Sequence, residues 1–137
     1  MNGEVMTGGV LGVIAAVASY LFGPWDAMIM VLLAVTALDY ITGVACAAVA
    51  KELSSSVGFK GLVKKVLTFV LVALAAMLDK LVPSTNGAVR SAVCMFYIAN
   101  EGISILENAG GLGLPLPNAL KKALVKLQAQ DESSQEE

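Results

Sequence analysis

The chain has 137 residues, of which 57% are hydrophobic and 15% charged, with a formal net charge of −2 at pH 7. Soluble domains are about 45–50% apolar and about 25% charged, so this composition favours an integral membrane protein. The lack of histidine excludes Ser–His and Cys–His catalysis, and the lack of a basic stripe with interleaved aromatic residues argues against nucleic acid as a partner.

The first apolar segment covers residues 8–23. At about 1.5 Å per residue it is short for a membrane span, and it could instead lie flat on the membrane. Small residues recur along it every three or four positions, and we expect the smooth face that they form to pack against another helix in lipid, although such residues are also common in membrane helices generally. They are Gly9, Gly12, Ala16 and Ser19.

The second segment, residues 27–50, is long enough to cross a hydrocarbon core of about 30 Å. Among Asp, Glu, Lys and Arg residues, it contains only Asp39. A carboxylate near the middle of a bilayer is unfavourable by about 3 kcal/mol. Asp39 lies on a stripe of small and polar residues, with Thr42 beside it. We expect this stripe to face protein or water while the larger side chains face lipid. The stripe consists of Thr36, Asp39, Gly43, Cys46 and Ala50.

The third segment follows a polar turn, and we expect a helix over about residues 58–82. A turn at residues 83–87, which contains proline, asparagine and glycine, separates it from the fourth segment. The fourth segment, residues 88–108, is apolar overall but carries polar residues at spacings of three and four along one helical face. Such a helix lies flat at the interface or spans with its stripe against helices or water. The stripe comprises Arg90, Cys94, Tyr97, Glu101, Ser104 and Asn108.

The polar residues of the second and fourth segments are our candidates for helix packing or for lining water. Arg90 and Glu101 lie three turns apart on one helix, so they cannot touch within it but could pair between subunits. The alternative is a structural salt bridge within one chain. The candidate set is Asp39, Thr42, Gly43, Arg90, Tyr97, Asn100, Glu101, Ser104 and Asn108.

The C-terminal part, residues 110–137, differs from the transmembrane helical domain that we assign to residues 1–109. It begins with a Gly/Pro-rich hinge at residues 110–117. A short, basic amphipathic helix is expected over residues 119–128, followed by an acidic tail whose composition predicts disorder.

Basic residues suggest the orientation in the membrane. Seven of the nine basic residues are cytoplasmic if both the loop after the second segment and the C-terminus lie inside. We expect an all-α bundle of four transmembrane helices, or of three if the first segment lies flat. The basic residues do not separate these two arrangements, because residues 1–50 contain no Lys or Arg. The seven are Lys51, Lys60, Lys64, Lys65, Lys121, Lys122 and Lys126.

Short motifs in the sequence indicate no enzyme. Neither a phosphate-binding GxxxxGK[ST] loop nor an HExxH, CxxC or GxSxG motif occurs. We therefore expect no catalytic residues, no cofactor and no metal site.

Three ordered motifs resemble the toxin-secretion/phage-lysis holin family. They are LDYITG at residues 38–43, KELSS followed by GFKG and a lysine pair at residues 51–65, and NEGISILEN at residues 100–108. The resemblance covers about residues 27–127. It implies a small, non-catalytic protein of the bacterial cytoplasmic membrane that forms homo-oligomers and opens lesions at a timed moment. Endolysin, or a large toxin in clostridial relatives, then crosses the bilayer, and an antiholin could regulate the process.

Two other functions remain open from the residues alone. A small channel or transport subunit would use the intramembrane acidic residues as ion sites and would give ion-selective currents. A non-catalytic accessory membrane module would recruit a partner through the C-terminal basic helix and acidic tail.

Overall fold

The computed structural model describes residues 2–135, so Met1, Glu136 and Glu137 lie outside the described residues. The described part is helical and contains no strand. The helices, in chain order, are α1 (Gly3–Phe22), α2 (Ala27–Val49), α3 (Ser55–Leu81), the 3-10 helix η1 (Pro83–Thr85), α4 (Ala88–Gly111) and α5 (Asn118–Gln135).

Helices α1 to α4 are each long and apolar enough to cross a membrane. The prediction of a short first helix beginning at residue 8 was wrong, because α1 begins at Gly3 and has 20 residues. At about 1.5 Å per residue it is about 30 Å long, which matches the hydrocarbon core of a bilayer. The all-helical, multi-pass membrane class is thus confirmed, with four helices that could serve as spans.

Helix α3 shows how the bundle suits lipid rather than water. Its large side chains point outward, as Leu67, Val70 and Leu74 are all exposed, whereas Ala75 and Ala76 are buried. Lipid tails are as apolar as leucine, so burying large side chains gains little in a membrane, while small residues let helices approach closely. The outward-facing surface is therefore the one expected to contact lipid.

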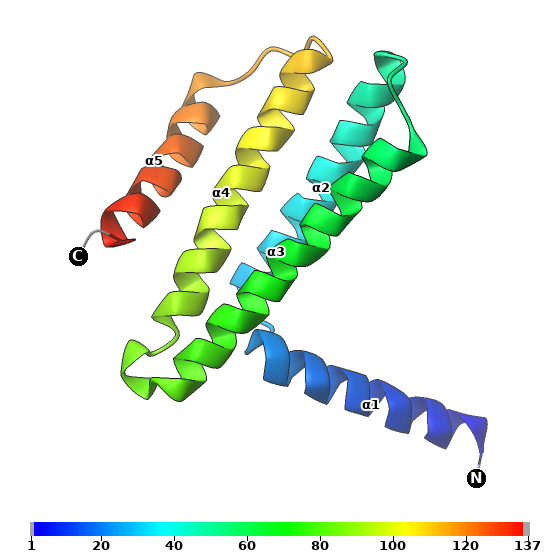
Figure 1. Cartoon of the computed structure of the whole chain (residues 1–137), viewed down its shortest axis with the longest axis vertical. Helices are drawn as coiled ribbons and strands as arrows, with labels where there is room; N and C mark the ends of the chain where they lie inside the picture. Colours follow the sequence, from blue (N-terminus) through cyan, green and yellow to red (C-terminus); the bar gives the residue numbers. More distant parts are fainter. Residues whose placement is uncertain (1, 136–137) are drawn as a thin grey trace.

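Helices α2, α3 and α4 form the bundle, with α4 packed against both others (Figure 1). A small apolar core is centred on Ile29, Leu32, Val72 and Cys94. The predicted inward stripe of α2 is buried at Thr36 and Asp39, half-buried at Gly43 and Cys46, and exposed at Ala50. The stripe therefore faces other helices along the middle of α2 and is exposed near the C-terminal end of the helix.

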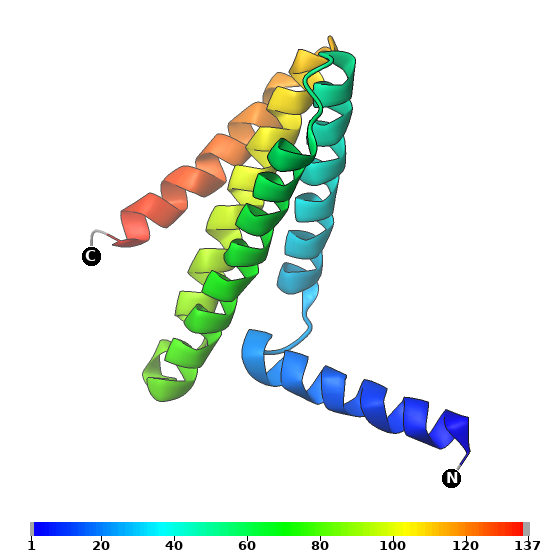
Figure 2. The same ribbon diagram turned by 45° about the vertical axis from the view of Figure 1, so that its right-hand side comes forward.

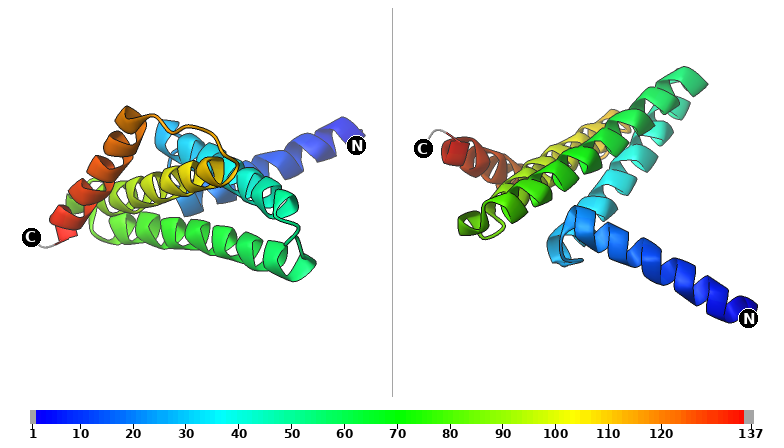
Figure 3. Two further views of the ribbon diagram at one scale, coloured as in Figure 1. Left: turned by 90° about the horizontal axis from the view of Figure 1, so that it is seen from above. Right: turned by 60° about the horizontal axis from the view of Figure 1, so that its bottom comes forward.

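Helix α1 projects away from the bundle (Figures 2 and 3). It contacts α3 near its C-terminal end, where the rings of Phe22 and Phe69 meet edge to face with centroids 6.3 Å apart. None of its residues is buried. The predicted small-residue face has no partner within the described chain, since Gly9, Gly12, Ala16 and Ser19 are all exposed. Its packing against another helix stays a prediction, and that helix would belong to another molecule.

Helix α5 folds back along α4 (Figure 1). Leu124 lies against Gly102 so closely that a Cβ atom at Gly102 would be 2.9 Å from Leu124 Cδ2. The predicted hinge is shorter than expected, because α4 continues to Gly111. The helix also continues to Gln135, through the segment that we expected to be disordered. Alanine, glutamine and glutamate are good helix formers, and residues 129–135 contain four of them.

Asp79 of α3 fixes the start of α4. Helix α4 follows Gly87, which has a φ of 80° and no side chain with which to cap the helix. Asp79 supplies the cap, because its carboxylate accepts hydrogen bonds from Val89 N at 3.1 Å and Arg90 N at 2.8 Å. Thr85 Oγ1 donates to the same carboxylate at 2.6 Å. This end of the bundle is therefore held by one side chain that joins α3, η1 and α4.

We expect Asp79→Ala to lower the free energy of unfolding of the detergent-solubilised protein by about 1 kcal/mol, the usual effect of losing a helix cap. Thermal unfolding followed by circular dichroism measures the change. Glu107→Ala is the matched control, since Glu107 is an exposed acidic residue on α4. Equal midpoints for Asp79→Ala and the unmodified chain would contradict the capping role.

Candidate functional site

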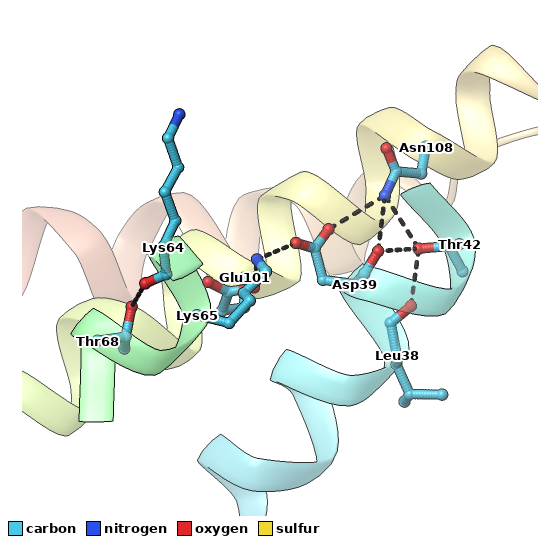
Figure 4. Close-up of polar contacts among 8 residues, drawn as sticks. All are labelled: Leu38, Asp39, Thr42, Lys64, Lys65, Thr68, Glu101 and Asn108. Carbon is cyan, nitrogen blue, oxygen red and sulfur yellow. Dashed lines mark hydrogen bonds and ion pairs between the residues drawn. The ribbon is translucent and has the colours of Figure 1, made fainter. Parts of the chain in front are cut away.

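A cluster of three charged side chains lies between α2, α3 and α4, near the middle of each helix (Figure 4). Lys65 Nζ donates hydrogen bonds to Asp39 Oδ2 and to Glu101 Oε2. The two carboxylates are each 8% exposed and the lysine 19%. One half-buried cation from α3 thus joins the two buried carboxylates of α2 and α4.

Asn108 extends this cluster along α4. Its Nδ2 atom lies 3.1 Å from Asp39 Oδ1, 3.3 Å from Asp39 O and 2.9 Å from Thr42 Oγ1. Thr42 Oγ1 lies 2.8 Å from Leu38 O, to which its hydroxyl can donate. Both carboxylate oxygens of Asp39 therefore have a donor, one from α3 and one from α4.

The position of Lys65 corrects one prediction from the sequence. We had counted Lys65 among the lysines that flank the membrane, but it lies about 15 Å along α3 from Ser55, at 1.5 Å per residue. Its ammonium is paired with two carboxylates, and such pairing is what makes a charge at this depth tolerable. The other six lysines of that set are exposed.

Arg90, in the first turn of α4, forms a second polar centre around the elbow between α1 and α2. Its guanidinium binds the Asp26 carboxylate at 2.9 and 3.2 Å and also donates to Phe22 O at 2.5 Å and Pro24 O at 2.8 Å. Gly23 lies beneath it with a φ of +76°, and a Cβ there would be 3.1 Å from Arg90 Nε. The elbow therefore needs glycine for both conformation and space.

These contacts show how the charged residues pair within one chain. Arg90 and Glu101 each have a partner in the same chain, and their pairing between subunits stays a prediction. The alternative, salt bridges within one chain, is the observed arrangement. Sequence reasoning missed Lys65 and Asp26 as partners. Two acidic residues in spans require a nearby cation, and Lys65 inside the predicted third helix was the available signal.

The remaining candidates divide between the site and its surroundings. Gly43 and Ser104 are half-buried and line a cavity of about 230 Å³ beside the cluster. Tyr97 packs against the apolar core and lines a second cavity of about 360 Å³, together with Asn100, which is exposed. In the described residues, no three His, Cys, Asp or Glu side chains gather as a metal site would require.

Replacing Lys65 by methionine should leave two buried carboxylates without their cation. We expect Lys65→Met to lower the free energy of unfolding in detergent by about 3 kcal/mol, as breaking a buried ion pair does. Thermal unfolding measures the loss. Lys64→Met is the matched control, because Lys64 is exposed on the neighbouring position. Similar losses in both variants would show that Lys65 has no special role.

The Arg90 guanidinium hydrogen-bonds the Asp26 carboxylate and holds the pKa of that carboxyl below its usual value. A carboxyl whose pKa is lower in the folded state stabilises the folded chain. The stabilisation is complete when the pH is above the pKa of the unfolded state, which is about 4. It disappears as the pH falls through the lower pKa of the folded state. Asp26→Asn should therefore lower the thermal midpoint slightly at pH 7, and the difference from the unmodified chain should vanish at acid pH.

Asparagine also caps helices well, so this variant keeps the bond from Ile29 N to residue 26, which is 3.1 Å long in the unmodified chain. The same unfolding measurement across pH tests the charge alone. A difference in midpoint that does not change with pH would contradict the ion pair with Arg90.

Comparison with known proteins agrees with this arrangement of helices. The bacteriophage holin family matches residues 16–129. An uncharacterised 14.9 kDa protein of Clostridium perfringens is 45% identical over 109 residues, which are 80% of this chain and 83% of that protein. An uncharacterised protein of Listeria innocua is 41% identical over 128 residues, covering 93% and 90% of the two chains.

A relative with a functional name is the probable holin of Bacillus phage phi105. It is 35% identical over 118 residues, which are 86% of each chain. No solved structure matches the chain significantly. The family match spans most of the sequence and includes the three helices that carry the buried cluster. This multi-pass membrane protein therefore belongs to the bacteriophage holin family.

Proposed function

We propose that this protein is a holin that assembles in the bacterial cytoplasmic membrane and opens lesions at a timed moment of host lysis. The observation that carries the proposal is the cluster of Asp39, Lys65 and Glu101, which hides three charges between three apolar helices of a single chain. A chain of this kind can accumulate in the bilayer with its charges satisfied. It also holds the polar side chains that a water-filled lesion would need.

Lesion opening is then a change of packing between two states. In the first, the charged side chains bind one another within each chain. In the second, many copies associate, the helices separate, and the same side chains turn toward water. Hydration of the charges offsets the lost ion pairs, since burying an ion pair already costs several kcal/mol of desolvation. A bias of about 5 kcal/mol would be enough to move such an equilibrium almost completely.

The partners follow from this proposal. Copies of the chain would associate through surfaces that have no partner within it, of which the small-residue face of α1 is one. Endolysin, or a large toxin, would pass through the lesion, and an antiholin could delay opening. The six exposed lysines support a cytoplasmic position for the α2–α3 turn and for the C-terminus. The permeabilising role requires no catalytic residue.

Induced expression in a bacterium tests the proposal, with membrane potential and culture density recorded with and without a cytoplasmic muralytic enzyme. We expect abrupt depolarisation at a reproducible time, and lysis when the enzyme is present. Ion-selective currents without release of the enzyme would favour a channel or transport subunit. Unperturbed growth, with the protein shown to be in the membrane, would favour an accessory module.

Loss of one acidic side chain should alter the time of opening. In Asp39→Leu or Glu101→Leu, Lys65 keeps one carboxylate partner, but the polar face that would line a lesion loses a charge. We expect earlier, later or abolished lysis with unchanged membrane insertion, measured by culture density and by immunoblotting of membranes. Glu107→Leu, an exposed position on α4, is the control. Unchanged lysis times in both variants would remove the proposed role of the cluster.

A further inference from the structure

The buried cluster has more acid than base. Asp39 and Glu101 share the single ammonium of Lys65, so with both carboxyls ionised the cluster has a formal charge of −1. An uncompensated charge between membrane helices is costly. One proton on either carboxyl makes the cluster neutral and allows the two acidic side chains to approach the same lysine without mutual repulsion.

Other titratable groups around the cluster do not supply the missing positive charge. Tyr40 of α2 donates its hydroxyl to Gly58 O at 3.4 Å and carries no positive charge in either form. Lys64 of α3 lines both cavities beside the cluster, but its side chain is exposed and points away from the carboxylates (Figure 4). Arg90 of α4 is bound to Asp26. Helix α5 reaches α4 through Leu124, and its lysines are exposed: Lys121, Lys122 and Lys126.

A route for protons leads to the cluster from one end of the bundle. The cavity of about 230 Å³ is lined by Leu53 in the α2–α3 turn, by Gly58 and Gly61 in the first turns of α3, and by Asp39 and Lys65. Ser104 and Asn108 also line it, and these polar groups can hydrogen-bond to water. The second cavity, of about 360 Å³, reaches Glu101 and Lys65 from the α3–α4 side. Water can therefore approach both carboxyl groups.

We propose that Asp39, Lys65 and Glu101 form a proton-binding site, in which the two carboxyl groups share one proton while the bundle is packed. The proton comes from water in the cavity and returns to it, with no other bond made or broken. When it leaves, the cluster carries an unpaired negative charge. The packed bundle binds one proton more than the opened one, so a higher pH favours opening.

Infrared spectroscopy of the full chain tests the site directly, because a protonated carboxyl absorbs apart from a carboxylate. The protein is placed at neutral pH in a detergent that has no carbonyl group. We expect one protonated-carboxyl band. Labelling all aspartate carboxyls, and separately all glutamate carboxyls, with ¹³C should shift part of the band in each sample, since the proton is shared. This measurement requires no substitution and therefore does not depend on the folding of a variant.

Variants then locate the proton. In Asp39→Asn or Glu101→Gln the remaining carboxylate balances Lys65 without a proton, so the band should be lost in each. It should persist in Glu107→Gln, which changes an exposed acidic residue of α4. Absence of the band from the unmodified chain at neutral pH, or its persistence in either cluster variant, would overturn the proposal.

The effect of the proton on opening rests on the proposed holin function and has its own measurement. Dye release from vesicles containing the unmodified chain should increase with pH, whereas Asp39→Asn should release dye independently of pH. The two proposals fail separately. If the chain shows the infrared band but causes no lysis, the proton site is supported and the holin function is contradicted. If the chain causes lysis but lacks the band, the holin function is supported and the proton site is contradicted.

Discussion

The pairing of one half-buried lysine with two buried carboxylates is the interaction on which the bundle depends. Helices α2 and α3 place many of their large apolar side chains outward, and the bundle has only a small core around Ile29, Leu32 and Val72. In lipid this arrangement provides little hydrophobic driving force between helices. Directional contacts must therefore fix how the helices meet, and Lys65 joins all three near their middle. Removing Lys65 would leave two carboxyl groups where a charge is costly.

The two ends of the bundle are held differently. At the end where α4 begins, Asp79 caps the helix and Arg90 binds the elbow between α1 and α2 through four hydrogen bonds. At the other end, the α2–α3 turn borders a cavity lined by Gly58 and Gly61. One end is thus fixed by a polar network, while the other has room for water. Under the proposed function, separation of the helices would begin at the hydrated end.

The two outer helices differ in how they relate to the bundle. Helix α1 has the length and apolarity of a span, yet it buries none of its residues in its own chain. Helix α5 instead covers α4 at Gly102, so it shields one face of the helix that carries Glu101. Association of copies through α1 would leave the buried cluster intact. Under the proposed function, one part of the molecule would therefore control assembly and another the packed and opened states.

Periodicity and composition determined much of this protein. The apolar segments predicted the membrane class and the helices, and spacings of three and four placed Asp39, Glu101 and Asn108 on inward faces. These signals are local, because a helix in lipid must satisfy its own backbone and turn its polar side chains away from the tails. The motifs at residues 38–43, 51–65 and 100–108 further indicated the family that the comparisons confirmed.

The partners of those residues came only from the tertiary structure. A lysine ten positions after the start of a helix has the same sequence signature whether it flanks the membrane or is buried, so Lys65 was misplaced. Arg90 likewise could have paired with Glu101 of another subunit, but the elbow at Gly23 brings Asp26 within its reach. Ion pairing joins residues far apart in sequence, and its geometry is set by how helices cross, which no local spacing encodes.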